Sequence, residues 1–368
     1  MMRTKPPFRA DHVGSLLRPP ALKAARQKRA SGAIGDAELK AVEDREIERA
    51  IRKQEEAGLY SVTDGEFRRS WWHLDFLWGL RGIARYTPPT GVAFAGTNTR
   101  SEGVQIAGAL DFGGHPMVDH FRFLKSHTQR MAKMTIPAPS AIYGRPIRIP
   151  IDPAVYPHID QMFDDLGKAY RKAVRAFADA GCRYLQLDEV FIAMLCDAKY
   201  RQQMKDRGDD PDRLAEIYAD LVNVAMSDIP ADMTITMHMC RGNYKSTFMG
   251  TGSYDAVQEI LFNKINVHGY FMEYDDERSG GFEPLRLLPA GKIAVLGIMT
   301  TKTGRLESKD ELRRRIDEAA KFAPLERLCI SGQCGFASTE EGNVLSEDEQ
   351  WAKLRRLVEV ADDVWGQE

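Results

Sequence analysis

Short apolar runs alternate with longer amphipathic segments along most of the chain. The short runs are bounded by Gly, Pro or Asp and predict eight strands, near residues 10–15, 59–63, 131–137, 183–187, 233–239, 267–273, 292–299 and 327–331. In the longer segments apolar residues recur at helical spacing, which predicts helices at about 36–57, 160–180, 210–226, 253–263, 308–321 and 346–364. Strands that alternate with helices form parallel βα units, and eight such units close into a (β/α)8 TIM barrel. The predicted fold is therefore α/β.

The stretch from about residue 67 to 130 is longer than one connection in such a barrel needs. It contains strand-like pieces such as GVQIAGALDFGG. Long ordered loops in compact domains are usually functional. We therefore expect this stretch to be an insertion after the second strand that covers the barrel mouth, within one domain formed by residues 1–368.

The composition indicates one large globular domain. A chain of 368 residues with 43% hydrophobic content can bury a large core. Its 51 Lys and Arg against 53 Asp and Glu give a net charge of −2, so nothing favours nucleic acid or an anionic membrane as a partner. The five scattered cysteines argue against a disulfide framework. The start, MMRTKPPFRADHVGS, has no apolar signal-peptide core and no apolar stretch is long enough to span a membrane, so a cytoplasmic location is expected.

His238, Cys240, Glu273 and Cys334 close three of the predicted strands, in TITMHMC, VHGYFMEY and RLCISGQC. Side chains alternate along a strand, so His238 and Cys240 should project in the same direction. Joined by Glu273 and Cys334 from neighbouring strand ends, they could enclose a tetrahedral zinc ion at about 2.0–2.3 Å. Cys334 lies in a Gly-flanked turn where packing requires no thiol, and a buried Glu273 would need a partner. The sequence therefore predicts a zinc site that activates a thiol for alkylation.

Each of these residues also has a structural alternative. A single His among Met residues is more often a hydrogen-bonded core side chain, and a single Cys is usually a small buried hydrophobe. Cys182, Cys196 and Cys329 lie in apolar contexts and are expected to be such packing residues. The metal interpretation therefore depends on all four ligands meeting.

Other polar residues follow the predicted strands in the same way: Ser15 after the first, Glu66 after the second, and Asp188 and Glu189 after YLQL. Ser15 and Asp188 could instead be turn or helix-cap residues. The carboxyl ends of barrel strands meet at one face, where active sites of this fold form. We therefore expect a polar pocket for a small zwitterion, with carboxylates for an ammonium and a hydroxyl or backbone N–H groups for a carboxylate.

Several separated motifs resemble those of cobalamin-independent methionine synthases, in their catalytic barrel and most closely in their short single-barrel relatives. The motifs are DHVGSLLRP at 11–19, VTDGEFRRSWWHLDF at 62–76, QLDEV at 186–190, HMCRGNY at 238–244, MEYDDERSG at 272–280 and SGQCGF at 331–336. The resemblance implies a zinc-dependent methyltransferase that converts homocysteine to methionine. It implies zinc ligation by His238, Cys240, Glu273 and Cys334, and homocysteine binding by Ser15, Glu66 and Asp188. Arg18 and Arg241, within two of these motifs, are also expected to bind substrate.

The chain departs from the full-length synthases where they bind and protonate the folate. A Glu that contacts the folate is aligned with Met194, and a His proposed to protonate the departing folate is aligned with Lys302. The N-terminal half that helps to bind the folate tail has no counterpart in this sequence. Lys302 could act as the acid, bind an anionic donor group, or be a solvated loop residue. Glu273, as an oxygen ligand, is the ligand expected to loosen when substrate sulfur binds.

Trp71, Trp72, His73, Phe76 and Trp78 form a dense aromatic cluster after Glu66. It could be an amphipathic helix that packs on the barrel, or a flat wall for a planar donor. Arg68, Arg69 and Arg241 near the same rim could hold carboxylates of substrate or pair with neighbouring Asp and Glu.

Three functions compete. The first is a zinc-dependent methyltransferase that makes methionine or a related thioether. Its donor would be a methylfolate, a methylcorrinoid, either free or on a carrier protein, or another methyl compound. The second is a zinc thiol alkyltransferase for another pair, like the relatives that open epoxides with coenzyme M, but Glu66 and Asp188 favour an amine over a sulfonate. The third is a non-enzymatic zinc-binding barrel, which an open metal position in a polar pocket argues against. The sequence does not indicate the oligomeric state.

Overall fold

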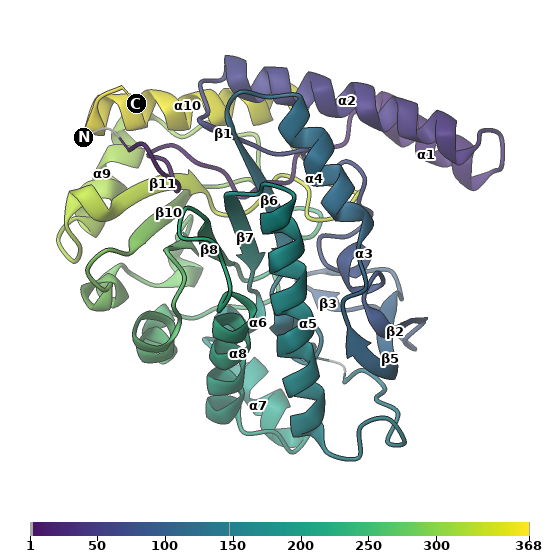
Figure 1. The fold of residues 1–368 in the computed structure, drawn as a ribbon. Helices are drawn as coiled ribbons and strands as arrows, with labels where there is room; N and C mark the ends of the chain where they lie inside the picture. The colour runs from purple at the N-terminus through teal and green to yellow at the C-terminus, as the bar shows by residue number, and fades with distance from the viewer. Residues whose placement is uncertain (1–2, 147, 368) are drawn as a thin grey trace.

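A curled sheet of parallel strands forms the centre of the molecule, and helices cover it (Figure 1). The computed structural model describes residues 3–146 and 148–367. Strands burying both faces need apolar residues throughout, as in Ile293–Met299, all of which are buried. The sheet follows chain order: β1 (Ser61–Val62), β6 (Met131–Pro137), β7 (Tyr184–Asp188), β8 (Thr234–Met239), β9 (Gly269–Glu273), β10 (Ile293–Met299) and β11 (Leu328–Gly332). The fold is α/β, with a parallel sheet that curls like that of a TIM barrel.

The first predicted strand, near residues 10–15, is not a regular strand, so the count of eight is only partly confirmed. Its start lies beside β11, where Ala10 forms a parallel bridge with Ile330. Towards β1, the Thr63 hydroxyl donates to the Gly14 carbonyl at 2.6 Å in place of a backbone ladder. Gly14 has a φ of 137°, which interrupts an extended strand. The segment therefore lies between β11 and β1, at the eighth position, without pairing regularly on both sides.

Most predicted helices are confirmed to within a residue or two. In α5 the buried residues recur every three or four positions along one face, as in Met162, Leu166 and Tyr170. Capping boxes begin α9 at Ser308 and α10 at Ser346. The helices are α1 (Pro20–Ala30), α2 (Asp36–Glu56), α3 (Leu74–Leu77), α4 (Pro116–Ser126), α5 (Ile159–Asp179), α6 (Phe191–Met194), α7 (Ala198–Asp206), α8 (Pro211–Ala225), α9 (Lys309–Ala319) and α10 (Glu347–Trp365).

One predicted helix was wrong. The expected helix over 253–263 is instead a short 3-10 turn, Tyr254–Ala256, followed by a π-helical turn, Ile260–Lys264. The sequence analysis also omitted α1, α4 and α7, whose apolar stripes are short. The α1–α2 hairpin extends from one end of the molecule (Figure 1). No helix in the described part of the chain has the length and apolar character to cross a membrane.

The stretch from 67 to 130 has secondary structure of its own, outside the central sheet. Its longest strand pairs antiparallel with β2, in a separate two-stranded sheet. The GVQIAGALD part of the expected strand-like piece is this strand. Besides α3 and α4, the elements are β2 (Arg81–Tyr86), β3 (Ala93–Phe94), β4 (Thr97–Asn98) and β5 (Gly103–Asp111).

A buried ion pair joins the first segment of the chain to the barrel interior. Lys133 of β6 and Asp11 have no exposed side-chain surface, and the Lys133 ammonium lies 3.2 Å from the Asp11 carboxylate. That carboxylate also accepts from the Ser61 hydroxyl at 2.9 Å and from the Tyr184 hydroxyl at 2.8 Å. Burial lowers the pKa of Lys133, and Asp11 opposes this effect. Asp11 therefore holds the irregular first segment against three strands.

Asp11→Asn should destabilise the protein by about 3–5 kcal/mol, because it leaves the Lys133 charge buried without a counter-ion. Urea unfolding followed by circular dichroism would measure the change. The matched control is Asp36→Asn, which breaks an exposed pair with Arg29 and should hardly change the stability, because water screens an exposed pair. Similar shifts of the unfolding midpoint in the two variants would contradict the role of Asp11.

Candidate functional site

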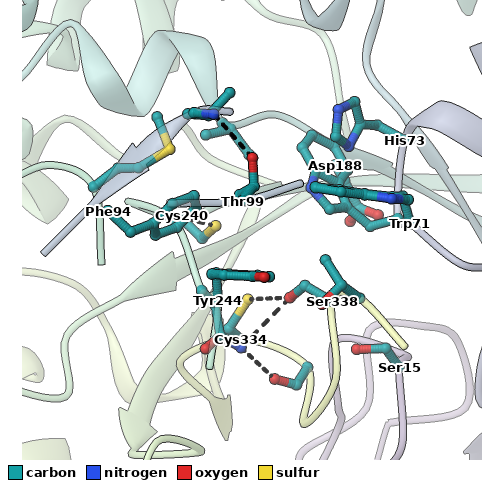
Figure 2. Close-up of a pocket in the computed structure, with 18 of the residues that line it drawn as sticks. Ser15, Trp71, His73, Phe94, Thr99, Asp188, Cys240, Tyr244, Cys334 and Ser338 are labelled. Carbon is teal, nitrogen blue, oxygen red and sulfur yellow. Dashed lines mark hydrogen bonds between the residues drawn. The ribbon is translucent and has the colours of Figure 1, made fainter. Parts of the chain in front are cut away.

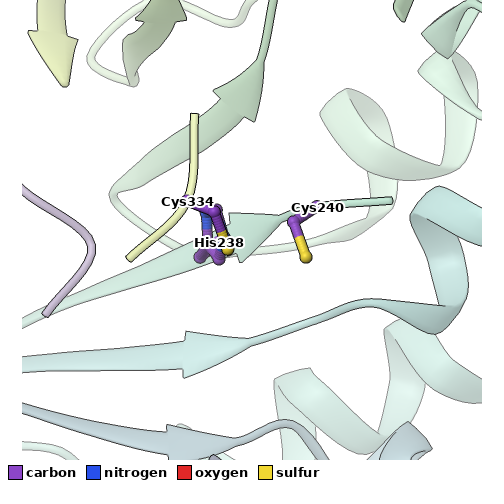
Figure 3. Close-up of side chains that lie close together, drawn as sticks. All are labelled: His238, Cys240 and Cys334. Atoms are coloured by element: carbon purple, nitrogen blue, oxygen red, sulfur yellow. The ribbon is translucent and has the colours of Figure 1, made fainter. Parts of the chain in front are cut away.

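Three predicted metal ligands meet at the carboxyl ends of β8 and β11. His238 lies in β8, Cys240 directly follows it, and Cys334 follows β11. One ligand atom from each lies within 4.8 Å of the others, and all three residues are buried. Figure 3 shows the imidazole and the two sulfur atoms at the end of β8, with Cys334 arriving from a separate segment. Ligands that are far apart in sequence are thus brought together by the parallel sheet.

The chemistry of the three groups fits a soft divalent metal. Neither ring nitrogen of the buried His238 has a hydrogen-bond partner within the described residues, and a buried polar group without a partner is costly. The Cys240 thiol and His238 lower the pKa of Cys334 well below the ordinary value, although burial opposes them. A thiolate, a second sulfur and an imidazole are ligands that zinc prefers. His238, Cys240 and Cys334 therefore form a candidate metal site.

Glu273, the predicted fourth ligand, is buried nearby but is not part of this group. One carboxylate oxygen accepts the Arg241 backbone N–H at 2.7 Å, and the other accepts from Arg278 at 2.6 Å and Lys302 at 3.3 Å. Burial would raise the pKa of Glu273, but Lys302, Arg278 and Arg241 lower it to about 2. The carboxylate is therefore ionised and held by cations. Its role as a ligand stays a prediction.

Lys302 is buried, so its interpretation as a solvated loop residue was wrong. Its ammonium lies 3.3 Å from Glu273 and 3.1 Å from Asp275. Burial lowers the pKa of Lys302, but these two carboxylates outweigh it and raise the pKa above the ordinary range. The ammonium thus stays protonated and fixes Glu273. Whether it takes part in catalysis stays a prediction.

A pocket of about 880 Å³, including its mouth, opens beside the candidate metal site (Figure 2). Its lining combines strand-end residues with residues of the 67–130 stretch. From the barrel come Val13, Ser15, Glu66, Asp188, His238, Cys240, Cys334 and Gly335; from the stretch come Trp71, Trp72, His73, Val92, Phe94, Thr99 and Glu102; and from other loops come Arg145, Pro146, Val190, Phe191, Gly242, Asn243, Tyr244, Met249, Ser338 and Thr339.

The two predicted carboxylates lie in this pocket and lack full partners. Glu66 accepts from the Thr135 hydroxyl at 2.8 Å through one oxygen, and its other oxygen has no partner among the described residues. Asp188 accepts from the Gln186 amide at 2.7 Å. Burial raises the pKa of Glu66, and burial and Glu66 raise the pKa of Asp188 to about 7, although His238 opposes the shift. Two such carboxylates favour a cationic group in the pocket.

The predicted Ser15 lies in the same pocket and is tied to the Cys334 loop. Its hydroxyl accepts the Ala337 N–H at 3.3 Å, and its carbonyl accepts the Phe336 N–H at 2.9 Å. A β-carbon at Gly335 would lie 1.9 Å from the Ser15 hydroxyl, so only glycine permits this approach. The first segment and the metal-ligand loop are thus fixed against each other.

Arg18 and Arg241, both predicted to bind substrate, do not line the pocket. The Arg18 guanidinium donates to four backbone carbonyls, including those of Glu66 at 2.9 Å and Ala337 at 2.7 Å. Arg241 donates to the Gly252 carbonyl at 2.6 Å and lies 4.1 Å from the centre of the Tyr254 ring. Arg18 is thus held by backbone carbonyls, whereas Nε and Nη1 of Arg241 have no hydrogen-bond partner among the described residues. Because neither residue lines the pocket, the structure does not support their assignment to the substrate.

The aromatic cluster is divided between the two interpretations given to it. Trp71, Trp72 and His73 line the pocket, whereas Phe76 packs in the core and the Trp78 indole donates to the Gly103 carbonyl at 3.0 Å. Arg68 pairs with Glu43 and Asp44, and Arg69 donates to the Thr135 carbonyl at 2.6 Å and lies 3.6 Å from Glu66. Arg68 and Arg69 therefore make contacts within the protein, and these contacts match the second interpretation, pairing with neighbouring residues.

Several pocket residues were not predicted from the sequence. Asn243 and Tyr244 belong to the HMCRGNY motif, in which only His238, Cys240 and Arg241 were assigned a role. Arg145 lies after β6, and no polar residue had been sought after that strand. Phe94, Thr99 and Glu102 had no signal in sequence, because they come from the separate stretch that only the fold brings to the strand ends.

Comparison with known proteins identifies relatives along the full chain. The family model for "Cobalamin-independent synthase, Catalytic domain" matches residues 8–363. The uncharacterized protein YxjG of Bacillus subtilis is 48% identical over 99% of this chain and 97% of its own. A 5-methyltetrahydropteroyltriglutamate–homocysteine methyltransferase of Bacillus velezensis is 25% identical over 95% of this chain, which corresponds to 42% of its own length.

A solved structure agrees with these sequence matches. The putative vitamin-B12 independent methionine synthase of Listeria monocytogenes is 40% identical, with a TM-score of 0.79, over 99% of this chain and 100% of its own. The resemblance inferred from the separated motifs is thereby confirmed. Because the family model spans nearly the whole sequence, the chain belongs to the cobalamin-independent methionine synthase catalytic-domain family and is a methionine synthase-like methyltransferase.

Proposed function

We propose that this methyltransferase is zinc-dependent and that it methylates the thiol of homocysteine to give methionine. The observation that supports this most is that the buried His238, Cys240 and Cys334 group opens into the same pocket as Ser15, Glu66 and Asp188. A metal that activates sulfur and groups suited to an amino acid are thus combined in one cavity. The homocysteine methyltransferase of Bacillus velezensis, which aligns with 95% of this chain, has a name that agrees with this assignment.

The charges in the pocket support an amino-acid thiol as substrate. Glu66 offers a carboxylate oxygen without a partner, and Asp188 lies beside it with a raised pKa. An ammonium group placed between them would relieve their repulsion and donate a charge-assisted hydrogen bond to each. Ser15 and the backbone N–H groups of its loop would face the substrate carboxylate. This arrangement argues against coenzyme M, whose sulfonate the two carboxylates would repel.

His238, Cys240 and Cys334 would hold the zinc ion, and their chemistry fits it. When bound, zinc lowers the pKa of a thiol so that it reacts as a nucleophile near pH 7. The protein would orient the substrate through its ammonium and carboxylate, so that its sulfur faces the donor. The apolar walls formed by Trp71 and Phe94 would exclude water from the reacting atoms. We further propose that the 67–130 stretch, which supplies these walls, is the lid of the site.

Glu273 would complete the metal site only by giving up some of its contacts with Arg278 and Lys302. We propose that it is a fourth, exchangeable ligand. X-ray absorption of the zinc protein with and without homocysteine would test this. Loss of one oxygen neighbour on adding the thiol is expected, and retention of that neighbour would contradict exchange.

Asp188→Asn should weaken homocysteine binding by roughly tenfold or more without loss of zinc, because the charge-assisted bond to the ammonium is lost. Isothermal titration calorimetry on zinc-loaded protein measures the affinity. The matched control is Asp197→Asn, at a carboxylate that caps α7 outside the pocket. Equal homocysteine affinity in Asp188→Asn and wild type would refute this assignment, and tighter binding of coenzyme M than of homocysteine would refute the proposed substrate.

A further inference from the structure

Arg145 is a buried cation in the pocket without a counter-ion. Of the described residues that line the pocket, it alone carries a permanent positive charge. The residue is only 7% exposed. Nε donates to the Ala141 carbonyl at 3.2 Å, and Nη2 has no partner within residues 3–146 and 148–367. Buried charges are normally paired, so this guanidinium lacks an anion.

Two other buried arginines have partners that Arg145 lacks. Arg18 donates to four backbone carbonyls, and Arg69 lies 3.6 Å from the Glu66 carboxylate. For Arg145, burial alone lowers the pKa to about 10, because no carboxylate lies close enough to offset the loss of hydration. No group of the folded protein therefore offsets the desolvation penalty of the Arg145 guanidinium. An anionic ligand would offset it.

Arg145 shares the pocket with a second polar group that lacks a partner. His73 is buried and lines the same pocket, and its Nδ1 has no partner among the described residues. Burial and the charge of Arg145 lower the pKa of His73. Figure 2 shows His73 and Trp71 across the pocket from Cys334. Arg145 also lines a smaller adjoining cavity with Val92 and Glu102. This end of the pocket thus continues beyond the space that an amino-acid thiol would fill.

The carboxylate of Glu102, which lines both cavities, has other partners. It accepts from the Trp71 indole at 2.7 Å and lies 3.6 Å from Arg100. The rings of Trp71 and Tyr244 are nearly parallel, 6° apart, with centres separated by 6.4 Å. The pocket therefore combines flat aromatic side chains, Trp71 and Tyr244, with one cation that lacks a counter-ion, Arg145. Such a site suits a planar or apolar body that ends in an anionic group.

We propose that Arg145, together with His73, binds a carboxylate of the methyl donor. The inference rests on the proposed function in one respect, that the pocket accepts two substrates and that Ser15, Glu66 and Asp188 hold the thiol. Arg145 then favours the binding of donors that carry an acidic group, whereas the rate of transfer also depends on the leaving group. It is a binding residue, and the transferred methyl group lies elsewhere on the donor.

Benzoate and benzamide, which differ in charge but hardly in shape, test the site by calorimetry on the zinc-loaded, full-length protein. Benzoate should bind roughly 10 to 100 times more tightly than benzamide, as expected for a charge-assisted hydrogen bond. Arg145→Met should abolish this preference, and Arg145→Lys should retain part of it. The matched control is Arg201→Met, because Arg201 lines neither cavity and already pairs with Asp212 at 2.7 Å.

Several outcomes would overturn the proposal. They are equal binding of benzoate and benzamide to the wild type, a preference that survives in Arg145→Met, and a preference that is lost equally in Arg201→Met. Displacement of benzoate by homocysteine would assign Arg145 to the thiol and overturn the donor assignment. If zinc and homocysteine bind as proposed but benzoate shows no preference, this inference fails alone. If the preference holds but homocysteine does not bind, the proposed function fails alone.

Thermal unfolding gives a second readout, measured first without any ligand and then with benzoate. Arg145→Met removes a buried charge that has no counter-ion, so its midpoint should equal or exceed that of the wild type. A marked decrease would show that Arg145 stabilises the fold and would contradict a site kept for ligand. Addition of benzoate should then raise the midpoint of the wild type but not that of Arg145→Met.

Discussion

Cys240→Ser or Cys334→Ser should remove the bound zinc and abolish methyl transfer, while the barrel stays folded. Both sulfurs lie within 4.8 Å of each other and of a His238 ring nitrogen. Loss of an outer partner of a metal ligand already costs about 10–100-fold in affinity. Loss of a ligand should therefore cost more than about 100-fold. A serine hydroxyl cannot replace the thiolate, because it stays protonated near pH 7.

The stability of the metal-free protein should come from the barrel core. The three ligands lie at the strand ends, whereas a large apolar cluster fills the interior. A domain of this size buries enough apolar surface to fold without a metal. Elemental analysis, initial rates and circular dichroism of each variant measure the three effects.

Cys196→Ser is the matched control, because Cys196 is partly buried and lies outside the three-ligand group. It should keep full zinc content and activity. A largely unfolded metal-free protein would contradict the assignment of stability to the core. Stoichiometric zinc in Cys334→Ser would contradict the assignment of the ligands.

Methyl transfer to homocysteine should be faster from methylcobalamin, or from a methylsulfonium that carries a carboxylate, than from methyltetrahydrofolate. The folate leaves as an amine that must be protonated, and a positioned acid contributes about 10² to 10⁴ in rate. Lys302 occupies the position where such an acid was expected, but its ammonium is held by Glu273 and Asp275, and Lys302 does not line the pocket. A corrinoid or sulfonium donor needs no such acid.

The measurement is a comparison of initial rates at equal donor concentration. The variant Lys302→Met tests whether Lys302 is the acid. If it is not, the substitution should lower the initial rate with methyltetrahydrofolate no more than the rates with the other donors. A clear preference for methyltetrahydrofolate, with one or three glutamates, would show that Lys302 or another residue supplies the proton. A selective loss of the folate reaction in Lys302→Met would identify Lys302 as that residue.

Local sequence was sufficient for the features that depend on near neighbours. The apolar periodicity of 159–179 and the capping residues at Ser308 and Ser346 determine where helices form, because these interactions lie within a few residues of each other. The fully apolar runs determined the parallel strands. The ends of those strands then placed His238, Cys240 and Cys334 at one face, since parallel strands share their carboxyl edge.

Tertiary structure decided what depends on partners that are distant along the chain. Glu273 looked like a ligand in sequence, but Arg278 and Lys302 reach its carboxylate across loops. Arg18 and Arg241 looked like substrate residues, but neither lines the pocket, and each donates to a carbonyl of another segment. Arg145 had no signal, because a missing counter-ion is a property of the folded surroundings and not of neighbouring residues. Sequence thus determined which groups stand at the strand ends, and long-range burial and charge decided which of them are free to meet a ligand.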